Sequence, residues 1–190
     1  HMISVGRLYE QKGHDLAIRT LAALRARRPE LDVRLRIVGD GPRMESLNRL
    51  AEELGMRGFV TGPAPARPLE VAAALCEADL ALVPSRVMPD GWQEAFCRVA
   101  IEAMATGLPV VATRSGGLPD TVGEGGVVAV REDAAALADA AEAVLSAMGP
   151  ADWAVRATRS AARFDIAGMY DDYQRLTAEL LERGSTVTAS

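Results

Sequence analysis

The sequence is poor in features that mark several classes of protein. Only 4% of its 190 residues are aromatic, so a core has to be built from Ala, Val, Leu and Ile. The two cysteines, Cys76 and Cys97, fit neither a disulfide framework nor a Cys-x-x-Cys metal site. We therefore expect a reducing, cytoplasmic setting for this chain.

Positive charge and long apolar runs are also scarce. The formal net charge is −5, which argues against a nucleic-acid partner, because phosphate backbones require a basic face. A small anionic ligand remains possible, since a few local cations suffice for it. No apolar run approaches the roughly 18 to 20 residues that a membrane span needs, and no signal segment opens the chain. The length fits one sizeable domain.

The start of the sequence has a pattern of its own. His1 and Met2 resemble the remnant of a cleaved purification tag, and residues 3–5 follow directly as a buried strand. We expect a fragment of a longer protein, with something substantial missing upstream. The predicted domain covers residues 3–183, and residues 184–190 are expected to form a flexible tail.

The chain alternates short β-branched runs with amphipathic helical stretches, which is typical of a parallel sheet covered by helices. Strands are expected at residues 3–5, 33–38, 59–61, 80–83, 108–112 and 127–130. Helices are expected at residues 14–27, 42–54, 68–76, 96–106, 134–148, 151–162 and 166–181. The prediction is an α/β fold, a Rossmann-like doubly wound parallel sheet of about six strands. Ligands of such sheets bind at the carboxyl ends of the strands.

The loop after the first strand places two cations, Arg7 and Lys12, between Gly6 and Gly13. Two fixed cations suit a diphosphate leaving group, because negative charge grows on it as the bond breaks. Taken alone, the loop is explained more simply by ordinary solvated surface charges. It also lacks the Gly-x-Gly-x-x-Gly pattern of dinucleotide-binding proteins, so a nicotinamide dehydrogenase is disfavoured.

Two carboxylates eight residues apart, Glu94 and Glu102, span the start of the helix expected at residues 96–106. Glu94 lies in the preceding loop, next to N–H groups at the helix start that form a ready anion site. Glu102, two turns further on, is placed to reach hydroxyl groups. Alternatively, Glu94 caps the helix and Glu102 is a surface residue. The apolar neighbours of Glu102 argue against that alternative, because a carboxylate among them needs a partner.

Two glycine-containing loops follow other predicted strands. Residues 39–42 contain Gly39 and are expected beside the first loop. Residues 115–120 contain two adjacent glycines, which permit close backbone approach to a ligand. Each loop taken alone is equally an ordinary turn.

These segments together carry a resemblance to a known family. Their order and spacing are similar to the C-terminal domain of retaining glycosyltransferases of the GT-B fold, family 4 (group 1). The matching segments are Gly6-Arg7-Leu8, Lys12-Gly13, Val38-Gly39-Asp40-Gly41-Pro42, Glu94-x7-Glu102, Glu102-Ala103-Met104-Ala105, Gly107-Leu108-Pro109-Val110 and Ser115-Gly116-Gly117. The resemblance covers nearly the whole chain.

The resemblance implies roles for matching residues. Arg7 and Lys12 would hold the donor's diphosphate, Glu94 would contact hydroxyls of the donor sugar, and Glu102 would bind the ribose hydroxyls. The remaining implied donor contacts are Gly6, Gly39, Phe59, Val60, Phe96, Cys97, Arg98 and Val99. Among these, residues 96–99 would act through their backbone, and residues 59 and 60 would lie against the base. Cys97 departs from the glycine common at its position, which implies a slightly tighter phosphate site.

The implied reaction is transfer of a sugar from a nucleotide diphosphate sugar, such as a UDP- or GDP-sugar, with retention at the anomeric carbon. The family works without a metal or other cofactor, and the sequence has no Asp-x-Asp pair. The implied partners are the donor and a missing N-terminal acceptor domain. Any peripheral membrane contact would come through that domain, and the fragment alone is expected to be inactive.

Two other functions stay open at this point. A non-catalytic nucleotide-sugar-binding module is disfavoured because it need not keep Arg7, Lys12, Glu94 and Glu102 together. Half of a nucleotide-sugar epimerase would require a different acid and base pair near the cleft. The last helix is expected by resemblance to face the absent domain, which would leave Met169, Tyr170 and Tyr173 exposed and could favour self-association.

Overall fold

The computed structural model describes residues 1–187 of the chain, with side chains described through residue 181. Six strands form one sheet in which every neighbouring pair is parallel, in the order β3-β2-β1-β4-β5-β6. The strands are β1 (Met2–Val5), β2 (Leu35–Val38), β3 (Val60–Ala64), β4 (Leu80–Val83), β5 (Val110–Ala112) and β6 (Gly126–Val128). The predicted six-stranded parallel sheet is confirmed.

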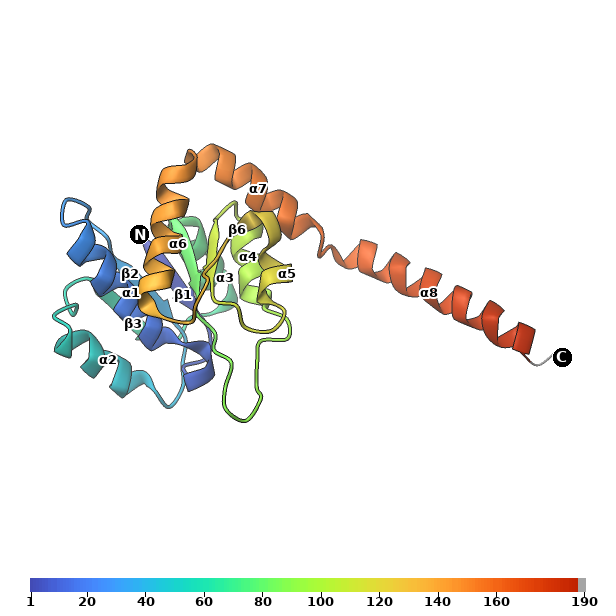
Figure 1. Cartoon of the computed structure of the whole chain (residues 1–190), viewed down its shortest axis with the longest axis horizontal. Coiled ribbons are helices and arrows are strands. Elements are labelled where there is room, and N and C mark those ends of the chain that lie inside the picture. The colour runs from blue at the N-terminus through green and yellow to red at the C-terminus, as the bar shows by residue number, and fades with distance from the viewer. Residues whose placement is uncertain (188–190) are drawn as a thin grey trace.

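Helices cover both faces of the sheet (Figure 1). They are η1 (Glu10–Lys12), α1 (His14–Arg27), α2 (Met44–Glu53), α3 (Pro68–Cys76), α4 (Arg98–Ala105), α5 (Leu118–Val122), η2 (Gly123–Gly125), α6 (Ala134–Ala147), α7 (Pro150–Ala162) and α8 (Ile166–Val187). One apolar core joins α1, α2 and α6, with Leu21 and Leu137 fully buried. A second core joins α3, α4, α5 and α7 around Met104 and Leu118. The sheet is thus doubly wound.

Several boundaries differ from the sequence prediction. Met2, expected outside the domain, belongs to β1, where it pairs with Leu35 and Leu80 and is 4% exposed. The short helix α5 occupies residues that were expected to form a turn. Strand β3 continues to Ala64, three residues beyond its expected end. This last difference changes which residues lie at the carboxyl edge of the sheet.

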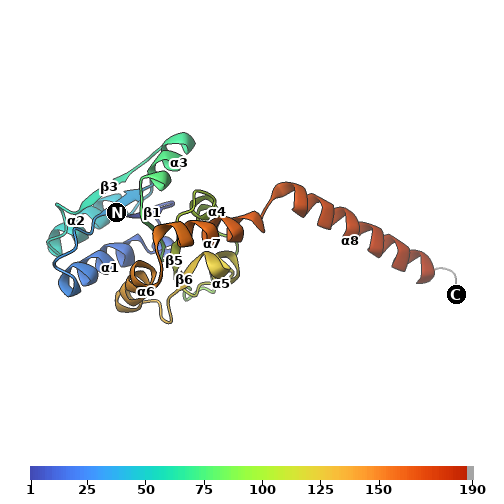
Figure 2. The ribbon, with the colours of Figure 1, turned by 90° about the horizontal axis from the view of Figure 1, so that it is seen from above.

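Helix α8 projects away from the body of the domain, as both views show (Figure 1, Figure 2). Met169, Tyr170 and Tyr173 are each more than half exposed, as predicted. The helix continues to Val187, so the tail expected from residue 184 begins within it, and the last three residues of that tail lie outside the described part. Among the described residues, no helix has the length and apolarity to cross a bilayer.

Candidate functional site

A cleft of about 780 Å³ opens at the carboxyl edge of the sheet. Its walls come from β1 and the loop after it, from α3 and Ala66 just before it, from the end of β4, and from α4 with the residues that lead into it. Nine residues expected in the site line it: Gly6, Arg7, Lys12, Glu94, Phe96, Cys97, Arg98, Val99 and Glu102. Residues distant in the sequence are thus brought to one place, as the parallel topology requires.

The loop carrying Arg7 and Lys12 is held tightly by its neighbours. A Cβ atom at Gly39 would collide with the carbonyl oxygen of Gly6, and one at Gly13, where φ is +66°, would collide with the carbonyl oxygen of Pro84. Both glycines therefore allow contacts between backbones that a side chain would block. The expected neighbourhood of the loops after β1 and β2 is confirmed, but Gly39 packs behind Gly6 and is not among the residues lining the cleft.

Lys12 and Glu94 form an ion pair inside the cleft. Lys12 Nζ lies 2.5 Å from Glu94 Oε2, and the two side chains are 24% and 8% exposed. Lys12 Nζ also lies 5.4 Å from the ring centroid of Trp92, within the range of a cation–π contact. Arg7 stays exposed beside the Tyr9 ring. The two predicted cations therefore have different surroundings, one paired and one open to an incoming anion.

Hydroxyl groups at the ends of β4 and β5 support Glu94. Ser85 Oγ donates to Glu94 Oε2 at 3.0 Å, and the Glu94 N–H donates to Ser115 Oγ at 3.2 Å. The two glycines after Ser115 pack against the backbone at Glu94 and Ala95, where a Cβ would collide with their carbonyl oxygens. The two glycines were expected to let the backbone approach a ligand closely. In the structure they instead let it approach the segment that carries Glu94.

Helix α4 begins at Arg98, with Cys97 at its N-cap in an extended conformation. Cys97 is 5% exposed, and burial raises the pKa of its thiol. The nearby N–H groups of Ala100 and Val99 favour the thiolate and lower this pKa, but by less than burial raises it. Arg98 is exposed and lines the cleft together with Val99. The helix start thus offers N–H groups and a guanidinium to an anion in the cleft.

Glu102 lies one turn after Arg98 on α4, and both line the cleft, as residues four apart on a helix must share a face. The side chain of Glu102 is exposed. The argument that apolar neighbours force Glu102 to have a protein partner is therefore wrong, because α4 turns this position toward the cleft and solvent. Its carboxylate is available to a ligand.

Phe59 and Val60 lie at the opposite edge of the sheet from the cleft. The Phe59 carbonyl accepts from the Leu35 N–H at the start of β2, and the guanidinium of Arg25 lies 3.3 Å from the Phe59 ring centroid. Val60 is 5% exposed within the core. Neither residue lines the cleft, because β3 runs on to Ala64 before it reaches the carboxyl edge, so their position does not support the expected contact with a base.

The corresponding wall of the cleft is made by residues that sequence reasoning did not select. They are small or apolar residues around the start of α3: Ala66, Pro68, Val71 and Ala72. Ser85 was missed as well, although its position two residues after the buried strand β4 could have identified it as a residue of the carboxyl edge.

His14 lies beneath the loop that carries the two cations. It is 3% exposed, its Nδ1 lies 3.0 Å from Ser4 Oγ, and its Nε2 has no hydrogen-bond partner within the described part of the chain. Burial lowers the pKa of His14 to about 4, although the carbonyl groups of Arg7 and Gly6 favour the charged ring. The imidazole is therefore neutral at pH 7 and packs as part of the loop's support.

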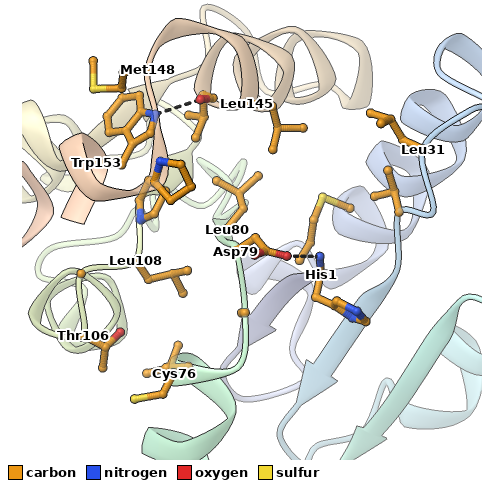
Figure 3. A pocket seen from close by; sticks show the side chains of 18 of the residues that line it. His1, Leu31, Cys76, Asp79, Leu80, Thr106, Leu108, Leu145, Met148 and Trp153 are labelled. Atoms are coloured by element: carbon orange, nitrogen blue, oxygen red, sulfur yellow. Dashed lines mark hydrogen bonds and ion pairs between the residues drawn. The ribbon is translucent and has the colours of Figure 1, made fainter.

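A second cavity, of about 390 Å³, lies at the amino ends of the strands (Figure 3). Leu80, Leu108, Met148 and Trp153 give it an apolar wall, and Asp79 contacts the amino group of His1 there. None of the predicted site residues lines it. Its apolar wall and the carboxylates of Asp32 and Asp79 disfavour a polyanionic ligand, so the carboxyl-edge cleft is the better candidate for the predicted site.

Taken together, the cleft offers cations and helix N–H groups to an anion, and two carboxylates to hydroxyl groups. No group of three or more His, Cys, Asp or Glu side chains placed to hold a metal ion is found among the described residues. The chain is thus an α/β domain whose carboxyl-edge cleft has the groups that suit a phosphorylated, hydroxyl-rich ligand.

Comparison with known proteins gives the family. The model of the family described as "Glycosyl transferases group 1" matches residues 1–147. The chain is 38% identical over 148 residues to D-inositol 3-phosphate glycosyltransferase of Pseudarthrobacter chlorophenolicus, covering 76% of this chain and 34% of that protein. The chain belongs to the group 1 glycosyltransferases, and it spans about a third of the length of this curated relative.

Solved structures show the same fold. The crystal structure of Anabaena Alr3699/HepE in complex with UDP has a TM-score of 0.77 and 23% identity, over 94% of this chain and 48% of that chain. The C-terminal domain of the group 1 glycosyl transferase LpcC from Francisella tularensis has a TM-score of 0.69 and 18% identity, over 86% and 85%. The sheet and its helices are thus one half of a GT-B fold.

Proposed function

We propose that this chain is the donor-binding half of a retaining glycosyltransferase of family 4. The complete enzyme would move a sugar from a nucleotide diphosphate sugar to an acceptor hydroxyl. One observation carries the proposal: Arg7 and Lys12 line the same cleft as Glu94 and Glu102. Cations for a diphosphate and carboxylates for hydroxyl groups are the two chemistries that such a donor requires.

The proposed roles are those that the family resemblance implies, and the lining of the cleft supports them. Arg7, Lys12 and the N–H groups at the start of α4 hold the diphosphate and stabilise the charge that grows on it as the glycosidic bond breaks. Glu94 accepts hydrogen bonds from the donor sugar, and Glu102 from the ribose. The acceptor hydroxyl attacks from the face that the diphosphate leaves, which retains the configuration. These cations supply the positive charge without a metal ion.

The small apolar wall at Ala66, Pro68 and Val71 is proposed to hold the base, in place of Phe59 and Val60. Small side chains there leave room for a flat ring between α3 and α4. The wall contributes no charged group, so backbone N–H and C=O groups would have to distinguish one base from another. UDP, GDP and ADP are all candidates, and the UDP complex of the Anabaena relative in fold supports the first.

The acceptor site is proposed to lie in an N-terminal domain outside this chain. The extent of the match supports this, because the chain covers a third of the curated relative but most of the solved C-terminal domain. Exposed apolar side chains along α8, including Met169 and Tyr173, suit contact with such a domain. The chain alone would then bind the donor and not turn it over, and the complete enzyme is proposed to act in the cytoplasm.

The test is calorimetric titration of the chain with UDP, GDP and ADP, beside an Arg7→Ala, Lys12→Ala variant. Saturable binding of one nucleotide is expected. The variant should bind it at least tenfold more weakly, or about 1.4 kcal/mol. Arg131→Ala serves as the control, because Arg131 is an exposed cation outside the cleft. Binding that is equal in the variant and the unmodified chain would reject the proposed diphosphate site.

A further inference from the structure

The two carboxylate oxygens of Glu94 have different surroundings. Oε2 receives both the Lys12 ammonium at 2.5 Å and the Ser85 hydroxyl at 3.0 Å. Among the described side chains, those of residues 1–181, none forms a hydrogen bond with Oε1, and Oε1 is not one of the buried polar atoms that lack a partner. Glu94 lines the cleft although its residue is only 6% exposed. One oxygen is therefore fixed by the protein, and the other faces the cleft.

The sheet itself fixes the position of the Ser85 hydroxyl. Ser85 is 2% exposed and lies two residues after the end of β4, and its carbonyl accepts from the hydroxyl of Thr113, the residue that follows β5. Ser115 Oγ accepts from the Glu94 N–H and donates to the Arg86 carbonyl at 3.1 Å. The segment from Ser85 to Glu94 is thus held at both ends by hydroxyl groups of the loop after β5. Ser85 Oγ therefore has little freedom to move away from Oε2.

We propose that Ser85 is a positioning residue that fixes Oε2 of Glu94 so that Oε1 accepts hydrogen bonds from the hydroxyls of the donor sugar. The inference rests on the proposed donor site. A diphosphate in the cleft competes with Glu94 for the ammonium of Lys12. As Lys12 turns to the phosphates, the Ser85 hydroxyl remains as the protein partner of Oε2. A carboxylate this buried would otherwise lose its fixed geometry when the donor arrives.

If Ser85 acts only through Glu94, its loss should weaken the binding of the sugar part of the donor and not that of the nucleotide. Ser85→Ala should weaken the binding of a nucleotide sugar by about fivefold, the range expected for the net effect of one hydrogen bond in a protein, and leave the binding of its parent nucleotide within about twofold. The calorimetric probes are UDP with UDP-glucose and UDP-N-acetylglucosamine, and GDP with GDP-mannose. Ser160→Ala removes another buried hydroxyl, 4% exposed in α7 and outside the cleft, and should change neither affinity.

A double-mutant cycle separates positioning from general damage to the fold. Glu94→Gln alone should weaken the binding of the nucleotide sugar, and adding Ser85→Ala to this variant should cause no further loss of affinity. Equal losses for nucleotide and nucleotide sugar in Ser85→Ala, or additive losses in the double variant, would overturn the role of Ser85 while leaving the donor site intact. If the unmodified chain binds neither a nucleotide nor a nucleotide sugar, the donor site is wrong and the role of Ser85 is rejected with it.

Discussion

At the scale of single residues, His14 makes folding sensitive to acid. Its pKa falls from 6.5 to about 4 because the ring is buried, so the unfolded chain takes up a proton over a range in which the folded chain does not. Stability is therefore complete above about pH 6.5 and falls as the pH drops toward 4, by about 3 kcal/mol from this group. Below about pH 4 His14 is protonated in both the folded and the unfolded chain, so this group causes no further loss of stability.

The prediction is checked by urea unfolding of the unmodified chain and His14→Asn at pH 7.0, 5.5 and 4.5. The substitution itself costs stability at pH 7.0, but the difference between the two proteins should shrink at each lower pH. Carboxylates titrate in both proteins, so the comparison isolates the histidine. A difference that stays constant over the three pH values would show that His14 is not held neutral by burial.

The two cysteines are expected to react at very different rates. Cys76 is exposed near the end of α3, whereas Cys97 is buried at the start of α4, where burial raises the pKa of its thiol. Because the thiolate is the reactive form, iodoacetamide at pH 8 should label Cys76 and spare Cys97 in the folded chain. Peptide mass spectrometry distinguishes the two sites. Labelling of Cys97 before Cys76 would contradict the packing around the cleft.

At the scale of elements, one ion pair joins α1 to the loop between β4 and α4. Both guanidinium nitrogens at the tip of Arg86 bond the Asp15 carboxylate, at 2.6 and 2.8 Å, and the Arg86 N–H donates to the Gln11 carbonyl. Burial of Asp15 opposes its ionisation, but the hydrogen bonds and charge of Arg86 outweigh it, and the pKa of Asp15 is lowered. The contact ties together the two loops that supply Lys12 and Glu94.

Arg86→Gln should therefore destabilise the domain by about 2 kcal/mol, because it leaves a partly buried carboxylate without its partner. The matched control is Arg131→Gln, which breaks an exposed pair with Asp133 and should cost under about 1 kcal/mol. Chemical denaturation measures both. Equal costs would mean that the Arg86 pair is screened like a surface pair.

The type and order of most elements could be predicted from the sequence, and so could both ends of α1, α3 and β4, whereas other ends, such as that of β3, could not. The alternation of short β-branched runs with amphipathic helical stretches predicted the parallel sheet, and the complete burial of β4 and β5 fits strands that helices cover on both faces. The end of β3 was misplaced because Gly62 and Pro63 suggested a turn. Since β3 is the edge strand of the sheet, a proline is tolerated there and the strand continues.

Whether a site residue could be predicted depended on whether the end of the strand before it was located correctly. Arg7, Glu94 and Glu102 were found because the loops after β1 and β4 were located correctly. Phe59 and Val60 were expected at the cleft because β3 was predicted to end at residue 61. The strand runs three residues further, which leaves both residues near the opposite edge of the sheet. The ion pair of Lys12 with Glu94 could not be predicted, since it depends on side-chain positions across two loops.

At the scale of the whole molecule, α8 is expected to contribute little to the stability of the domain. Its side chains at Ile166, Met169, Tyr173 and Leu180 are all more than half exposed, and the helix projects from the body (Figure 2). Ending the chain after Asp165 should therefore leave the melting temperature within about 2 °C, because little buried surface is lost. It should also reduce self-association, since an exposed apolar stripe is removed.

Thermal unfolding and analytical ultracentrifugation of the full and shortened chains test this together. A full-length chain in which four α8 side chains are replaced by Gln is the companion variant, because it keeps the helix length and removes the apolar stripe. A drop of about 5 °C or more on shortening would show that α8 stabilises the domain directly.

The central claim is that a nucleotide diphosphate binds at the carboxyl-edge cleft, and the two tryptophans allow it to be tested in one spectrum. Trp92 lies beside Lys12 at the cleft, whereas Trp153 lines the cavity at the amino edge and donates its indole N–H to the Val144 carbonyl. The measurement is a titration of the ¹⁵N-labelled chain with UDP, GDP and ADP, followed through the two indole N–H signals. We predict that one nucleotide shifts the Trp92 signal saturably and leaves that of Trp153 in place. A shift of Trp153 alone, or of neither signal, would contradict the assignment of the cleft as the donor site.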